Sequence, residues 1–233
     1  MSILSTLKTN EKTKHYITDG DILVTRRIET VSPTKIDTDI LPEIDAVKGA
    51  VFSSSFEFTG RYSRWDVAFL RPPLEISFSN NRYSINALNE RGEFLLELVR
   101  THFSNSRFDF IRGFNDQQTS LHGTIPATAA IQNEEDRTKQ PSIFHIIREL
   151  KQLFASDEDQ FFGLYGAFGF DLIYQFEQLA KEKKRPDDQK DLVLYLPDEL
   201  TIVDHHLSIA YTLSYDVQFN KKSTNHLERT GQF

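Results

Sequence analysis

The sequence predicts an α+β fold, in which antiparallel β-sheets pack in layers and helices cover their outer faces. Three observations predict this class. Short segments with alternating or β-branched residues cluster towards both ends of the 233-residue chain, amphipathic helical patterns lie between them, and no internal repeat of solenoid length is present.

The first part of the chain predicts a lead-in followed by strands. Residues 1–14 are polar, and we expect them to be flexible. A short helix is expected near residues 37–47. Strands are expected at 21–30, 50–55, 64–70, 74–79 and 82–87, with Asn80-Asn81 as a tight hairpin turn.

The rest of the chain carries the helices. The clearest spans Ser142–Phe154, where Ile143, Ile146 and Leu150 recur at the spacing of one helical face. Further helices are expected at 93–99 and 171–184, and further strands at 161–168, 192–196, 200–203 and 207–213. The stretch 101–138 shows no clear pattern, and the polar residues 220–233 are expected to form a disordered tail.

Composition and charge exclude several classes of function. The net charge of −7 opposes nucleic-acid binding, which needs a concentrated basic surface. The absence of cysteine excludes disulfides and thiolate metal sites. No segment approaches the roughly 18 apolar residues of a membrane span. We therefore expect a cytoplasmic protein that binds neither nucleic acid nor membrane.

Three motifs suggest chemistry but have simpler explanations. The spacing of Gly163, Gly166 and Gly169 does not fit a dinucleotide site, so close backbone packing between a strand and a helix is favoured. Asp204-His205-His206 lies between two predicted strands, which favours a polar turn over a metal site. The carboxylate runs 134–136 and 187–188 are typical of solvent-exposed loops, and no catalytic triad can be argued from spacing alone.

Most of residues 15–215 resembles the N-terminal half of anthranilate synthase component I, in the long form that is fused to a glutamine amidotransferase. Two stretches carry the resemblance: GAVFSSSFEFTGRYSRWDVAFLRPPLEIS at 49–77 and RTKQPSIFHIIRELKQLFASDEDQFFGLYGAFGFDLIYQFE at 137–177, which continues at 185–206. The resemblance implies a layered α/β/β/α structure, with residues 15–219 forming the domain.

The resemblance also implies a feedback site for L-tryptophan. In the family, a serine at the end of a short strand contacts the amino acid. The matching segment here is Val51–Ser55, with Ser55 the best match and Ser54 where an acidic residue often stands; Arg64 matches a basic residue that follows. A hydroxyl can hydrogen-bond a zwitterion, while a guanidinium pairs with its carboxylate.

The motifs that bind chorismate and magnesium in this family belong to its C-terminal half and do not occur in this sequence. We therefore expect a regulatory part that holds no cofactor and forms no anthranilate alone. It is expected to bind L-tryptophan weakly and to expose an apolar face. The partners implied are a catalytic half and a glutamine amidotransferase. The alternatives are one part of a split enzyme and a stand-alone binding module.

Overall fold

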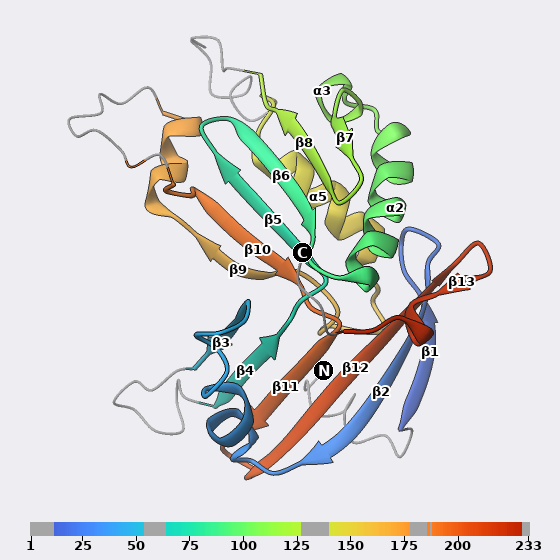
Figure 1. Cartoon of the computed structure of the whole chain (residues 1–233), viewed down its shortest axis with the longest axis vertical. Coiled ribbons are helices and arrows are strands. Elements are labelled where there is room, and N and C mark those ends of the chain that lie inside the picture. Colours follow the sequence, from blue (N-terminus) through green and yellow to red (C-terminus); the bar gives the residue numbers. More distant parts are fainter. Residues whose placement is uncertain (1–11, 54–63, 127–139, 178–185, 187, 230–233) are drawn as a thin grey trace.

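The structure is a computed structural model that describes residues 12–53, 64–126, 140–177, 186 and 188–229. Within these residues two antiparallel sheets meet at an angle, and helices cover one of them (Figure 1). The predicted α+β class, with antiparallel sheets and outer helices, is confirmed.

Sheet A has seven strands and contains both the beginning and the end of the described chain. Its order is β1 (Thr13–Ile17), β2 (Leu23–Val31), β12 (Ile209–Phe219), β11 (Glu199–Asp204), β4 (Trp65–Leu70) and β3 (Gly49–Phe52), and β13 (Lys222–Ser223) pairs with β12. The long strand β12 pairs with β2 over residues 210–218 and with β11 over residues 209–214, and thus forms the centre of the sheet.

Sheet B has six strands. Its order is β7 (Asn115–Gln117), β8 (Ser120–Thr124), β6 (Arg82–Ala87), β5 (Leu74–Ser79), β10 (Leu192–Leu196) and β9 (Tyr165–Phe168). Asn80 and Asn81 both have positive φ, at 50° and 63°, which is the geometry of the predicted hairpin turn between β5 and β6.

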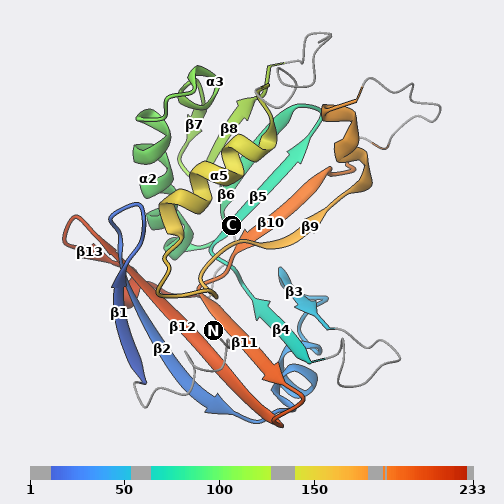
Figure 2. The same cartoon turned by 180° about the vertical axis from the view of Figure 1, so that it is seen from behind.

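Alternation along β5 explains why helices cover only one face of sheet B. Leu74, Ile76 and Phe78 are buried and point to one side, because successive residues of a strand face opposite ways. The helix α2 (Glu90–Ser104) packs on β5 and β6 and contacts α5 (Ile143–Phe154), which lies across the same face (Figure 2). Ser142 and His145 form a capping box at the start of α5.

The remaining helical elements are short. They are the π-helix η1 (Ile36–Ile40), α3 (Asp109–Arg112), and the 3-10 helices η2 (Phe170–Gln175) and η3 (Thr224–His226). The π-helix packs on β4 at the outer face of sheet A, where Ile36 and Ile40 join a small apolar cluster.

The two sheets are joined covalently and by packing. The chain passes from β4 to β5 and from β10 to β11 through short connections. The ring of Phe69 in sheet A lies 5.8 Å from that of Tyr195 in sheet B, and Lys48 pairs with Glu75 at 2.6 Å. One large apolar cluster consequently runs through both sheets and the helices.

Several expectations need correction. The tail predicted to be disordered from residue 220 contains β13 and η3, and Arg229 pairs with Asp198 at 3.0 Å. The lead-in predicted to extend to residue 14 already contains the start of β1. The stretch 101–138 contains the end of α2, then α3, β7 and β8, and the helix predicted from residue 171 is 3-10 up to Gln175. Residues 178–185 lie outside the described part.

Candidate functional site

The end of the β3–β4 pair holds Arg64, the one predicted ligand-binding residue that lies in the described part of the chain. Phe52, the last residue of β3, pairs with Val67 of β4. Ser53 follows Phe52 and Arg64 directly precedes β4, so both lie at the same end of this strand pair. Ser54 and Ser55 lie outside the described residues, so the structure does not place their hydroxyls.

Arg64 is held in a defined orientation. Its Nε and Nη2 atoms donate hydrogen bonds to the carboxylate of Asp204, at 3.3 Å and 3.0 Å. The guanidinium carbon lies 4.7 Å from the centre of the Trp65 ring, within the range of a cation–π contact. The Arg64 side chain is 38% exposed, and its Nη1 atom donates no hydrogen bond to any described residue. An edge of the guanidinium is therefore free to bind an anion.

Asp204 serves as the anchor of this arginine. Its side chain is fully buried, and it also accepts hydrogen bonds from the backbone N–H groups of His206 and Leu207. Burial alone would raise the pKa of the Asp204 carboxyl, but the hydrogen bonds from Arg64 and these two N–H groups outweigh it and lower the pKa.

The Asp204-His205-His206 motif forms the turn that was favoured at the sequence level. Asp204 ends β11, and residues 205–208 make the turn to β12. The His205 ring lies 2.6 Å from a carboxylate oxygen of Asp66 rather than beside His206 or Asp204. Among the described residues, no group of three or more His, Asp or Glu side chains is arranged to hold a metal ion.

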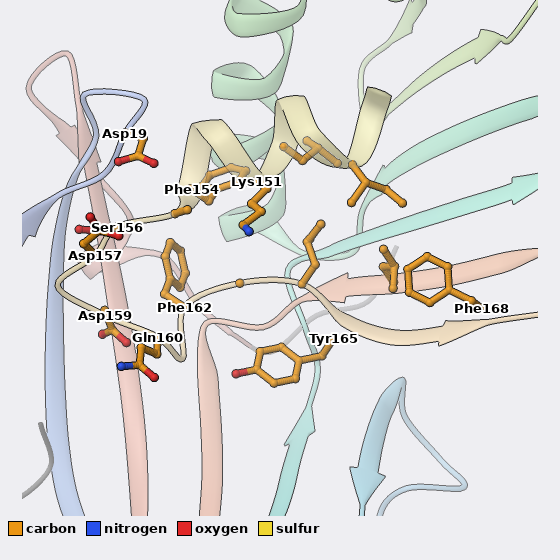
Figure 3. A pocket seen from close by; sticks show the side chains of 16 residues that line it. Asp19, Lys151, Phe154, Ser156, Asp157, Asp159, Gln160, Phe162, Tyr165 and Phe168 are labelled. Carbon is orange, nitrogen blue, oxygen red and sulfur yellow. The ribbon is translucent and has the colours of Figure 1, made fainter. Parts of the chain in front are cut away.

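A pocket of about 660 Å³ lies between α5 and the loop that leads to β9 (Figure 3). Buried apolar residues line it, among them Leu150, Phe154 and Phe162, together with the exposed residues Lys151 and Asp157. Sequence reasoning did not predict this pocket, because its wall is a loop whose position depends on a distant residue.

That distant residue is Arg26 of β2. Arg26 and Asp159 form an ion pair at 3.1 Å in which both side chains are almost fully buried, and Asp159 belongs to the loop. Burial, followed by the nearby Asp159 charge, raises the pKa values of the Tyr16, Tyr165 and Tyr215 hydroxyls around this pair.

Aromatic contacts connect this pocket with the β3–β4 end. Tyr165 lines the pocket, and its ring lies 6.4 Å from that of Phe52 and 6.2 Å from that of Phe69. Phe52 immediately precedes Ser53 and is 37% exposed. The candidate site thus combines a partly free guanidinium with an exposed aromatic ring.

Close backbone packing is found at Gly166, but its partner is a strand and not the helix that the glycine motif was expected to pack against. A Cβ atom at this position would lie 2.1 Å from the carbonyl oxygen of Val193 on the paired strand β10. The approach is to a neighbouring strand and not to a phosphate-binding helix. In the described part of the chain, no helix is both long and apolar enough to cross a membrane.

Comparison with known proteins gives consistent names. The chain is 34% identical over 217 residues to "Anthranilate synthase" of Azospirillum brasilense, a match that covers 93% of this chain and 29% of that protein. It is 36% identical over 86 residues to "Anthranilate synthase component 1" of Serratia marcescens, covering 35% of this chain and 16% of the relative.

A third relative bears the same name. "Anthranilate synthase component 1" of Buchnera aphidicola subsp. Diuraphis noxia is 31% identical over 132 residues, covering 54% of this chain and 24% of that protein. The chain therefore spans less than a third of the length of these curated relatives. No protein-family model matches it.

Proposed function

Because this chain is homologous to the N-terminal portion of anthranilate synthase over almost its whole length, we propose that it carries the L-tryptophan-binding regulatory site of such an enzyme. The enzyme would form anthranilate and pyruvate from chorismate, with ammonia delivered by a glutamine amidotransferase and with magnesium bound outside this chain. The chain itself would sense the end product of tryptophan biosynthesis.

The observation that carries the proposal is the pairing of β3 with β4. The register brings Ser53, the first of the three serines that follow Phe52, to the same end of the strand pair as Arg64, although eleven residues separate Phe52 from Arg64 in the sequence. A ligand seated there would meet the guanidinium edge of Arg64 and the exposed ring of Phe52. Those two groups suit the carboxylate and the indole of tryptophan.

Weak binding is expected for two physical reasons. Asp204 already neutralises the charge of Arg64, which reduces the attraction for a ligand carboxylate. The family resemblance also implies that residues outside this chain complete the pocket. Full burial of an indole is worth about 4 to 6 kcal/mol, so half of that burial contributes about 2 to 3 kcal/mol. Polar contacts from Ser55 and Arg64 add about 2 to 3 kcal/mol, and an association cost of at least about 4 kcal/mol offsets most of the sum. A dissociation constant in the millimolar range or weaker follows.

Trp65 provides a specific probe for this binding. It is the only tryptophan of the chain, so its indole N–H gives one side-chain signal in a ¹H–¹⁵N correlation spectrum. Its ring is stacked against Arg64. Titration of the ¹⁵N-labelled chain with unlabelled L-tryptophan should shift this signal in a saturable manner, whereas D-tryptophan and L-alanine should shift it much less.

Matched variants separate the site from general effects. Arg64→Gln and Ser55→Ala should abolish the saturable shift, while Arg82→Gln, which removes an exposed arginine of sheet B, should leave it unchanged. A micromolar dissociation constant would show that these residues form a complete pocket. An unchanged titration in Arg64→Gln would place the tryptophan site elsewhere and contradict the proposal.

A further inference from the structure

A second pocket, of about 570 Å³, lies on the helical side of the molecule. It is formed by the C-terminal end of α2, the loop that follows it, and the exposed face of α5. The residues that line it include Arg107, Phe108, His145, Arg148 and Glu149. The pocket is rich in cationic side chains, although the whole chain has a net charge of −7.

The two arginines of this pocket have no carboxylate partner among the described residues. Most described arginines pair with a carboxylate, for example Arg26 with Asp159 and Arg91 with Asp198. Arg107 and Arg148 form neither an ion pair nor a side-chain hydrogen bond with any described residue, and both are exposed. Their donor groups are therefore available to a ligand.

The single carboxylate among the lining residues is already occupied. Glu149 lies 2.8 Å from the Nε2 atom of His102, and it accepts a hydrogen bond from the Ser106 hydroxyl at 3.1 Å. These two contacts hold the Glu149 carboxylate against the end of α2 and the residues that follow it. This leaves the local charge of the pocket positive.

His145 adds a fixed donor. The backbone N–H of Ser142 donates to its Nδ1 atom at 3.2 Å, so the proton of the neutral ring resides on Nε2. The Phe108 ring packs edge-to-face with the imidazole, with ring centres 4.8 Å apart, and the guanidinium carbon of Arg107 lies 4.7 Å from the centre of the same Phe108 ring. His145 and Arg107 are thus both oriented by one aromatic residue.

The electrostatic environment of His145 reflects the same arrangement. Burial lowers the pKa of its imidazole, and the charges of Arg148 and Arg107 lower it further, against the opposing effects of the Ser142 backbone and Glu149. An anion bound between these groups would reverse the effect of the arginines.

We propose that this pocket binds a small, multiply charged oxyanion through the guanidinium groups of Arg107 and Arg148 and the Nε2–H of His145. Phosphate esters and polycarboxylates share this chemistry, since planar guanidinium groups form paired hydrogen bonds to either. The pocket is built by the helices on sheet B, so this inference is independent of the tryptophan site at the end of β3 and β4.

The test is a titration of the full chain with inorganic phosphate and, separately, with citrate, at constant ionic strength. The His145 ring signals should shift in a saturable manner, and the His145 pKa measured by NMR should rise when the anion is present. Stronger binding of phosphate would assign a phosphorylated ligand, and stronger binding of citrate a polycarboxylate. Sulfate, whose charge is constant above pH 4, should bind more tightly at pH 5.5 than at pH 8.

Charge-matched variants decide between a site and general attraction. Arg107→Gln and Arg148→Gln, each of which removes one positive charge, should each weaken binding by about tenfold, which corresponds to the loss of one charge-assisted hydrogen bond. Arg82→Gln should bind as the parent chain does. Absence of a saturable shift, or equal weakening by Arg82→Gln, would overturn the proposal. Helical circular dichroism of each variant shows that loss of binding is not loss of fold.

Discussion

The Arg91 side chain joins three parts of the fold. It lies in the first turn of α2, is only 2% exposed, and forms ion pairs with Asp198 of the β10–β11 connection and Asp216 of β12. It also donates to the backbone carbonyls of Tyr215 and Thr224, each at 2.6 Å. The helical layer, sheet A and the segment after β12 therefore depend on one guanidinium.

Replacement of Arg91 by methionine should destabilise the protein by about 3 kcal/mol, because it leaves two buried carboxylates short of a partner. Arg229 and Arg27 still pair with these carboxylates, which limits the loss. Urea unfolding followed by circular dichroism measures it. Glu97 lies on the same helix as Arg91 and forms an exposed pair with Lys222 of β13. Glu97→Gln, which breaks this pair, should cost less than about 1 kcal/mol. Equal costs for both variants would show that Arg91 is no such junction.

Asp204 gives a stability contribution that depends on pH. Because its folded-state pKa is lowered, its contribution is complete above the unfolded pKa of about 3.9 and is lost as the pH falls through the folded value. Asp204→Asn should therefore cost about 1 to 2 kcal/mol at pH 7. The difference from the parent chain should shrink at pH 3 and below. A difference that stays constant with pH would show that the charge of Asp204 contributes nothing.

At the scale of elements, the β9–β10 pair depends on the absence of a side chain at Gly166. A Cβ atom there would overlap the Val193 carbonyl, so Gly166→Ala should cost about 1 to 3 kcal/mol through backbone displacement. Gly163→Ala is the matched control, since a Cβ atom at Gly163 meets nothing within 4 Å. Thermal unfolding of the two variants should separate them. A stable Gly166→Ala chain would indicate that β9 adapts to the substitution.

Strands with strong boundaries could be predicted from the sequence. The expected ranges 74–79, 82–87 and 192–196 coincide with β5, β6 and β10, because prolines and Asn80-Asn81 bound clear alternations. Strand β8 could not be predicted, since Leu121 is its only buried apolar side chain. Its glycine, Gly123, is required because a Cβ atom there would overlap the Tyr83 ring, a contact that the sequence does not reveal.

Features that depend on distant partners were also missed. The polar residues after Phe219 are ordered because the Thr224 carbonyl accepts from Arg91 and Arg229 pairs with Asp198. The site was predicted only in part. The resemblance selected Arg64, but its anchor Asp204 lies 140 residues away, and no spacing rule connects the two. The pocket of Figure 3 likewise depends on the pairing of Arg26 with Asp159.

At the scale of the whole molecule, aromatic side chains are exposed at the open edge of sheet B. Phe168, Phe170 and Phe176 are 53%, 86% and 37% exposed, and Phe144 stacks on Phe168 with ring centres 5.9 Å apart. In the described part of the chain, β9 pairs with β10 on one side and with no strand on the other. An unpaired strand edge beside exposed rings favours association with another protein surface.

We therefore expect the isolated chain to self-associate through this edge. Sedimentation velocity should show a weight-average mass that rises with protein concentration, and Phe170→Lys should suppress the rise, because a charge at the edge opposes strand pairing and removes the exposed ring. Ile17→Lys is the matched control: Ile17 is 59% exposed on β1, the edge strand of sheet A, and its replacement should leave association unchanged. A monodisperse monomer at all concentrations would show that this edge needs no partner, and equal suppression by Ile17→Lys would assign the association to charge alone.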